Sequence, residues 1–211
     1  MLSLIECVNL SVKFDDKQVL DKFNYNFEDG TITAIMGKSG KGKTTILRCI
    51  AGLHKLGLHD GTVWYHHDGK CENIRKPNPN IFMMHQHYTN FPWKNCFENV
   101  MFPLELKGLS NEATALEAGQ LLDAVGLGDH ITKYPSELSG GMNQRLAFAR
   151  AMIMKPKVLL MDEPMSALDE KTRKDMQNIL LDMHKKSKNT IILVTHSKEE
   201  AKILADNIIE F

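Results

Sequence analysis

The chain has 211 residues, a length that fits one domain or one domain carrying a sizeable insertion. Its 43% hydrophobic and 25% charged residues are ordinary for a globular protein that buries a core without disulfides. Lysine plus arginine equals aspartate plus glutamate at 26 each, so the balanced charge argues against a dedicated nucleic-acid-binding protein, and we expect no nucleic-acid partner.

The cysteines and the N-terminus indicate a cytoplasmic chain. No two of the four cysteines are close enough for a CxxC motif, which favours a reducing compartment. The N-terminus lacks a basic start followed by an apolar run, so we predict no secretory signal. The longest apolar runs are too short to cross a bilayer. Any membrane role is therefore expected to require a partner.

The first part of the chain predicts strands that lead into a glycine-rich loop. Antiparallel strands are expected over the first thirty residues, where aromatic residues alternate with asparagines at Phe23, Tyr25 and Phe27. A short apolar strand at Thr31–Met36 leads directly into Gly37–Gly42. A helix is expected from about Lys43, with Gly52 as its end.

The middle of the chain changes from strands to helices. Strands are expected at Thr62–His66 and at Ile81–His85, the second leading to Gln86. One helix is predicted from Ser110, its expected N-cap, to Val125, with Leu116, Leu121, Leu122 and Val125 as its apolar residues. A second helix is predicted to start near Ser139 and to end near Pro156.

The last part of the chain returns to an alternation of strands and helices. Val158–Met161 and Thr190–Thr195 are apolar on both faces, which is typical of strands buried in a parallel sheet. A helix with an apolar stripe at Met176, Ile179, Leu180 and Met183 lies between them, and a short helix is expected at Glu199–Ala205. The alternation predicts an α/β fold with a parallel sheet, interrupted by a mostly helical block.

The glycine-rich loop satisfies the pattern GxxxxGK[ST], and a predicted strand and helix flank it. Glycines let several backbone N–H groups converge on phosphates, and the helix N-terminus adds partial positive charge. Lys43 is expected to reach the β and γ phosphates, and the Thr44 hydroxyl to bind Mg²⁺. The sequence therefore predicts a P-loop NTPase core whose nucleotide contacts come from Gly37, Lys38, Ser39, Gly40, Lys41, Gly42, Lys43, Thr44 and Thr45.

Two carboxylates follow the apolar strand at Val158–Met161. In open parallel sheets, ligands bind at the carboxyl ends of strands. Asp162 is expected to hold Mg²⁺ through a water, and Glu163 to polarise the water that attacks the phosphate. Taken alone, the pair is equally compatible with an ordinary acidic turn, but the phosphate loop favours the functional interpretation. Pro164 has no N–H and ends the strand.

A third motif is Leu138-Ser-Gly-Gly-Met142-Asn-Gln-Arg145. Together with the phosphate loop and the acidic pair, it resembles the signature of the ATP-binding cassette (ABC) ATPases, and the resemblance covers nearly the whole chain in the family's order. It implies one ABC ATPase domain over residues 1–211. Residues 1–88 and 146–211 would form the nucleotide-binding core, with an N-terminal antiparallel part, and residues 89–145 an inserted α-helical subdomain carrying the signature.

The resemblance implies a dimer of two copies packed head to tail, with ATP and Mg²⁺ as cofactors. Each ATP would lie between the phosphate loop of one copy and the Ser139, Gly140 and Gly141 of the other. These residues open a helix and would present N–H groups to the γ-phosphate. Met142 stands where the family usually has glutamine, which removes a polar side chain while the backbone donors remain.

The resemblance also assigns roles to single residues. Gln86 resembles the glutamine that reaches Mg²⁺ or the attacking water, and His196 the switch histidine that contacts the γ-phosphate. Asp169 resembles the residue that relays contacts across the dimer. Phe14 stands where the family offers a tyrosine to stack on adenine, although its role as a strand core residue is equally compatible. The implied catalytic residues are Glu163, His196, Gln86 and Lys43, and the implied metal ligands are Thr44, Gln86 and Asp162.

An aromatic run, Phe91-Pro-Trp93 followed by Phe97-Glu-Asn-Val100, is compatible with core packing and with a groove for a membrane partner. It resembles importer ATPases such as those for nitrate or sulfonate. This implies an ATPase subunit that is peripheral on the inner face of the cell membrane. Its partners would be separate transmembrane permease subunits and a solute-binding protein. The nine histidines show no tight ligand spacing, so a zinc site is not favoured.

Other functional classes stay open at this point. A cytosolic ABC ATPase in DNA repair or translation would copurify with DNA or ribosomes and not with membranes. A P-loop small-molecule kinase would phosphorylate an acceptor and has no use for the LSGG segment. An ATP-binding regulator without turnover is disfavoured by the intact Glu163.

Overall fold

The computed structural model describes residues 3–15, 17–53, 59–85 and 89–211, and it divides the chain into two compact units. Unit 1 comprises Met1–Met83, Lys157–Glu163 and Lys188–Phe211, and unit 2 comprises Met84–Pro156 and Pro164–Ser187. Residues 146–156 and 164–187, which the sequence analysis placed in the core, therefore belong to unit 2. Gln86 lies outside the described residues.

The first sheet of unit 1 is antiparallel, as the alternating pattern predicted. Its strand order is β2-β1-β4-β5, formed by β1 (Ser3–Phe14), β2 (Lys17–Glu28), β4 (His59–His67) and β5 (Lys70–Asn73). Phe27 is fully buried, and Phe23 and Tyr25 pack partly buried against the same hydrophobic cluster. One face of β2 therefore faces the core because its apolar residues recur at every second position.

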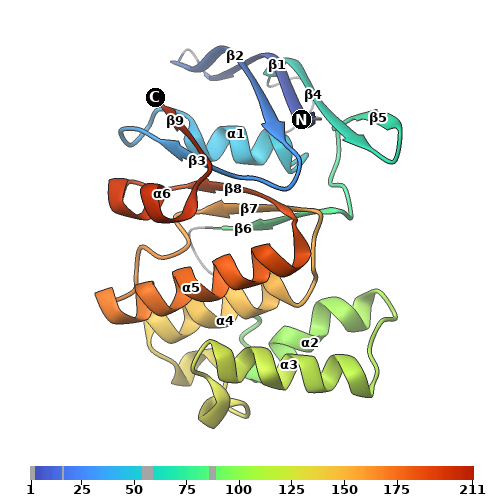
Figure 1. Cartoon of the computed structure of the whole chain (residues 1–211), viewed down its shortest axis with the longest axis vertical. Helices are drawn as coiled ribbons and strands as arrows, with labels where there is room; N and C mark the ends of the chain where they lie inside the picture. The colour runs from blue at the N-terminus through green and yellow to red at the C-terminus, as the bar shows by residue number, and fades with distance from the viewer. Residues whose placement is uncertain (1–2, 16, 54–58, 86–88) are drawn as a thin grey trace. The chain divides into compact units, whose positions relative to one another are not determined.

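The second sheet has the strand order β6-β7-β8-β3-β9 (Figure 1). It contains β6 (Ile81–Met84), β7 (Val158–Asp162), β8 (Thr190–Val194), β3 (Ile32–Met36) and β9 (Asn207–Glu210). The pairs β7–β8, β8–β3 and β3–β9 are parallel, and every residue of β3, β7 and β8 is buried. In this register Asp162 and Ile35 both lie opposite Val194, so the carboxyl ends of the three central strands are aligned.

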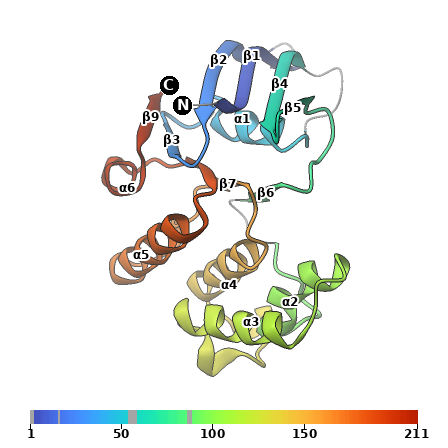
Figure 2. The ribbon, with the colours of Figure 1, turned by 45° about the vertical axis from the view of Figure 1, so that its right-hand side comes forward.

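Helix α1 (Lys43–Ile50) lies between the two sheets (Figures 1 and 2). Its Ile46, Leu47 and Ile50 are fully buried in one hydrophobic cluster with residues of both sheets. Burial of such a side chain contributes about 2 kcal/mol. The helix that follows the phosphate loop is therefore anchored along its whole length. The short helix α6 (Lys198–Leu204) packs against β3.

The end of α1 provides a test of this packing. Gly52 has φ +67°, and an added Cβ would lie 2.3 Å from the carbonyl oxygen of Lys76. We expect Gly52→Ala to lower the free energy of unfolding by about 3 kcal/mol, because backbone strain adds to a steric clash. Gly69 has φ +71° with nothing within 4 Å of an added Cβ, so Gly69→Ala should cost only about 1 kcal/mol. Urea denaturation of both variants measures the difference, and equal losses would contradict the clash.

Unit 2 is helical. Its elements are α2 (Cys96–Leu106), α3 (Glu112–Ala124), the 3₁₀ turns η1 (Gly128–His130) and η2 (Pro135–Glu137), α4 (Gly140–Met152) and α5 (Glu170–Ser187). Helix α2 lies within the predicted helical block but was not predicted as a separate helix, although the Asn95–Glu98 capping box marks its start. The predicted N-cap Ser110 is wrong, because the Asn111 side chain accepts from the Thr114 N–H instead. Within the described ranges, no helix is both long and apolar enough to span a membrane.

Candidate functional site

The phosphate loop lies between β3 and α1, where the sequence placed it. Gly42 caps α1 with φ +86°, and an added Cβ would lie 2.8 Å from Leu20 Cδ2 and 2.9 Å from the carbonyl oxygen of Val19. Only glycine fits this left-handed position beside a neighbouring strand. The loop before it is open to solvent at Lys38, Ser39, Gly40 and Lys41, whereas Thr45 is buried in the first turn of α1.

Lys43 is folded back onto the loop that precedes it. Its Nζ donates to the carbonyl oxygens of Gly37 at 2.9 Å and Lys38 at 2.8 Å, and the residue is only 5% exposed. Burial lowers the pKa of Lys43, and the neighbouring carboxylates of Glu163 and Asp162 oppose this shift. An ammonium group has three N–H donors, so it can hold the loop closed and also bind an anion in the loop.

Two oxygen groups meet at the carboxyl end of β7. The Thr44 hydroxyl donates to Asp162 Oδ1 at 3.0 Å, and Asp162 is 3% exposed. A hydroxyl and a carboxylate are hard oxygen ligands, which Mg²⁺ prefers. The predicted metal ligands Thr44 and Asp162 therefore lie together, at the start of the helix that follows the phosphate loop.

Glu163 and His196 form a pair at the ends of β7 and β8. His196 Nε2 lies 2.8 Å from Glu163 Oε1, and both side chains reach solvent. Glu163 has φ +49°, a rare backbone conformation for a residue with a side chain, and its N–H donates to the carbonyl oxygen of Val194 at 3.0 Å. Such strain persists only where the surroundings hold it, and it is concentrated at functional sites.

The signature residues belong to unit 2. Ser139 and Gly140 are exposed at the start of α4, where the Ser139 hydroxyl accepts from the Met142 N–H at 3.2 Å. Gly141 follows in the first turn. The N–H groups of a first helical turn have no partner within the helix, so they can bind an anion.

Asp169, also in unit 2, caps α5 by accepting from the N–H and the hydroxyl of Thr172, and these hydrogen bonds lower the pKa of the exposed Asp169.

The remaining predicted positions differ in outcome. Phe14 is 42% exposed at the end of β1, so its interpretation as a core residue is wrong, and stacking on a base stays a prediction.

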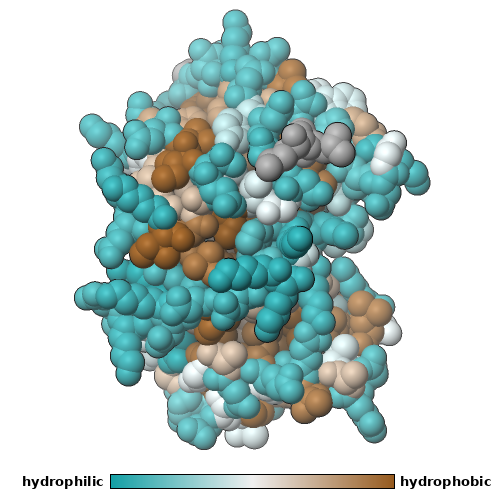
Figure 3. All heavy atoms as spheres, viewed as in Figure 1, coloured by the Kyte–Doolittle hydropathy of each residue, from teal (hydrophilic) through white to brown (hydrophobic). Residues whose placement is uncertain are grey.

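The two rings of the aromatic run Phe91-Pro-Trp93 lie in different environments. Phe91 packs its ring 4.7 Å from that of Phe102, whereas Trp93 is 69% exposed. Other hydrophobic side chains reach the surface over α2 and α3 (Figure 3), including Leu116, which was expected on an apolar face but is 65% exposed.

A family model described as ABC transporter matches residues 20–166, which include the phosphate loop, the signature segment and the acidic pair. The chain belongs to the ABC transporter family. The resemblance predicted from the three motifs is therefore confirmed at the level of the family.

Curated relatives are named as import ATP-binding proteins. The chain is 40% identical to the sulfate/thiosulfate import ATP-binding protein CysA of Mesostigma viride, covering 96% of this chain and 58% of that protein. It is 42% identical to the spermidine/putrescine import ATP-binding protein PotA of Fusobacterium nucleatum, covering 97% of this chain and 54% of that protein. The chain thus spans a little over half the length of these ABC relatives. A probable CysA of Chlorella vulgaris is 38% identical and is covered over 86% of its length.

A solved ABC cassette has the same fold. The dimeric post-hydrolysis structure of the ATP-binding cassette MJ0796, bound to ADP and Pi, superimposes with a TM-score of 0.83 at 27% identity, covering 98% of this chain and 94% of that one. The predicted α/β architecture, with its parallel sheet, antiparallel sheet and flanking helices, is therefore confirmed as that of an ABC cassette.

Proposed function

We propose that this chain is the ATP-hydrolysing subunit of an ABC importer. The observation that carries the proposal is the alignment of Lys43, the Thr44–Asp162 contact and the Glu163–His196 pair at the carboxyl ends of the central strands of unit 1. This set contains a phosphate loop, two oxygen ligands and a carboxylate that can orient a water. The import names of the relatives support the direction of transport.

The residues of the site then divide the tasks of binding and hydrolysis. The loop N–H groups and Lys43 bind the phosphates of ATP, and Thr44 and Asp162 hold Mg²⁺ together with Gln86. The ion would neutralise charge on the transferred phosphoryl group. Glu163 orients the attacking water and takes up its proton. His196, whose Nε2 lies 2.8 Å from Glu163 Oε1, positions that carboxylate and contacts the γ-phosphate. Phe14 offers an exposed ring on which the adenine stacks.

The working form is a dimer with a second copy of the chain. The exposed start of α4 at Ser139–Gly141 offers unpaired N–H groups that fit a γ-phosphate held by the other copy, and Asp169 relays contacts between the copies. The dimeric MJ0796 cassette with ADP and Pi supports this arrangement. Within one cassette of residues 1–211, segments 1–88 and 146–211 would form the nucleotide-binding core and segment 89–145 the helical subdomain, a division along the sequence that differs from the two compact units of the fold.

The membrane partners are permease subunits, which the exposed Trp93 would help to contact, and a solute-binding protein. The chain would be cytoplasmic and peripheral on the inner face of the cell membrane. The relatives are named for an anion, sulfate, and for polycations, spermidine and putrescine, so a cassette of this type serves opposite solute charges. Solute specificity therefore resides in the partner subunits and not in the cassette. The resemblance to nitrate or sulfonate importers stays a prediction.

Two measurements test the proposal. The purified chain is expected to release phosphate from ATP only with Mg²⁺, and without phosphorylating an acceptor. From cells, it is expected to copurify in mild detergent with an integral membrane protein. Copurification with ribosomes or DNA instead would favour the alternative of a cytosolic ABC ATPase outside transport. The absence of phosphate release in the presence of the copurified membrane protein would overturn the proposal.

A further inference from the structure

Asn143, in the first turns of α4, holds the backbone that precedes the helix. Its Nδ2 donates to the carbonyl oxygens of Pro135 at 2.9 Å, Leu138 at 3.3 Å and Ser139 at 3.2 Å, and the residue is 7% exposed. An amide nitrogen carries two hydrogens, so three acceptors require that at least one hydrogen is shared. A single buried side chain therefore holds the turn that leads into α4 at three carbonyl oxygens.

The carbonyls that Asn143 holds determine where the signature N–H groups point. A peptide unit is planar, so the carbonyl of Leu138 and the N–H of Ser139 lie in one rigid peptide plane, and the carbonyl of Ser139 and the N–H of Gly140 lie in the next. A hydrogen bond that fixes the carbonyl oxygen of a peptide plane therefore also fixes the direction of its N–H group. Ser139 and Gly140 are exposed residues, so the peptide units that carry these donors reach the surface while their carbonyl oxygens are held from inside.

The same side chain is tied to the segment that follows Gln86. Asn90 Nδ2 donates to the carbonyl oxygen of Asn143 at 2.8 Å and to its Oδ1 at 2.9 Å. Further along α4, Arg150 Nη1 donates to the carbonyl oxygen of Thr89 at 2.6 Å, and its guanidinium lies 4.9 Å from the centre of the Phe91 ring. The segment 89–91 is therefore bound to α4 at two points.

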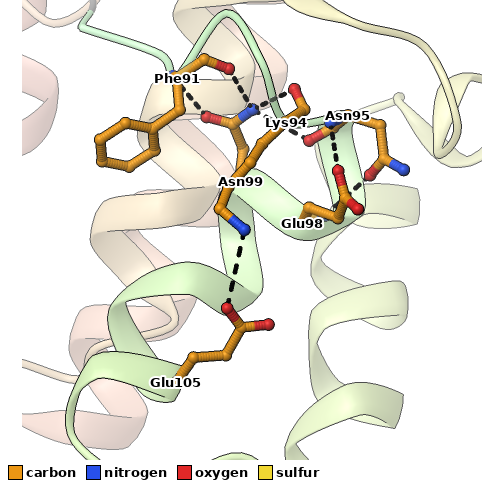
Figure 4. A network of polar contacts seen from close by, with 6 residues as sticks. All are labelled: Phe91, Lys94, Asn95, Glu98, Asn99 and Glu105. Atoms are coloured by element: carbon orange, nitrogen blue, oxygen red, sulfur yellow. Dashed lines mark hydrogen bonds and ion pairs between the residues drawn. The ribbon is translucent and has the colours of Figure 1, made fainter.

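A second buried amide holds this segment from α2 (Figure 4). Asn99, fully buried, accepts from the Phe91 N–H at 2.8 Å and donates to the carbonyl oxygens of Phe91, Lys94 and Asn95. Lys94 also reaches Glu105 at 3.8 Å. With both sides anchored, residues 89–95 cannot shift without moving Asn143 or breaking buried hydrogen bonds, which is costly.

We propose that Asn143 is a positioning residue for the signature segment. It orients the N–H groups of Ser139 and Gly140 toward the phosphate held by the second copy. Because Asn90 bonds to Asn143, the orientation of these N–H groups also depends on the position of the segment that follows Gln86. The inference rests on the proposed nucleotide-sandwich dimer, whose residues it deepens. Asn143 touches no substrate in this role, since its atoms act through the backbone of residues 135–139.

The test uses the full chain carrying Glu163→Gln, which is expected to dimerise with ATP without turnover. Asn143→Leu keeps the size of the side chain and removes its donors. We expect the dissociation constant of the ATP-dependent dimer, measured by analytical ultracentrifugation, to rise about ten-fold. Asn90→Ala leaves the bonds of Asn143 to the turn intact, and should raise that constant about three-fold. The affinity of the monomer for a fluorescent ATP analogue should stay unchanged, because the phosphate loop is in unit 1.

Asn111→Ala provides the control for a purely structural effect. It removes the N-cap of α3 in the same unit, and should lower the unfolding temperature without weakening the dimer. The inference is overturned if Asn143→Leu and Asn90→Ala dimerise as the parent does, or if Asn111→Ala weakens the dimer equally. If Asn143→Leu yields no folded protein, Asn90→Ala alone decides. A parent that never dimerises with ATP overturns the proposed dimer itself, which is a distinguishable result.

Discussion

Replacing Glu163 by glutamine is expected to lower the rate of ATP hydrolysis by about 10²- to 10⁴-fold while leaving ATP binding intact. Glutamine has the shape of glutamate but cannot take up a proton from the attacking water. Its amide can still bond to His196, whose Nε2 lies 2.8 Å from Glu163 Oε1, so the site keeps its geometry. Steady-state phosphate release at saturating ATP, together with a separate ATP-binding titration, measures both parts of the expectation.

The matched control is Glu199→Gln, the same change at an exposed position of α6 in the same unit. It should leave turnover within about two-fold of the parent, because exposed charges contribute little. The variant Glu163→Gln should also accumulate an ATP-dependent dimer. If it retained near-normal turnover, Glu163 would not be the group that activates the water.

The sequence was sufficient to predict the parts of the site that are contiguous in the chain. The phosphate loop, the acidic pair and His196 each end or follow a short, mostly apolar strand, and such strands lie buried in the middle of a parallel sheet. Parallel register then brings their carboxyl ends together. This is why Thr44 could be expected near Asp162 before the 3.0 Å contact was known.

Contacts between distant backbone segments could not be predicted in this way. Asn143 belongs to the signature motif, where the sequence analysis assigned roles to Ser139 and the two glycines only. Its three carbonyl partners depend on the conformation of the turn at 135–139, and no periodic sequence pattern predicts that conformation. Helix α2 was missed because Pro103 and its aromatic residues obscure the helical period, although its capping box was readable. Leu116 was misplaced because an apolar residue at a helical spacing is not always buried.

Replacing Lys43 by methionine is expected to raise the dissociation constant for MgATP about 100-fold, because a charged, buried partner of the phosphates is removed. The fold should survive. Methionine matches the length of the lysine stem, and the lost bonds to Gly37 and Lys38 should cost about 1 kcal/mol of unfolding free energy. Isothermal titration with MgATP and urea denaturation separate the two effects.

Lys41 gives the control for this prediction, because it lies in the same loop but is exposed. Lys41→Met removes the same charge from the loop and should change the dissociation constant by about three-fold or less, since an exposed charge is screened by solvent. Equal losses for the two variants would mean that the loop attracts ATP by its net charge. A loss confined to Lys43→Met would mean that binding depends on the one ammonium group that the loop carbonyls hold in place.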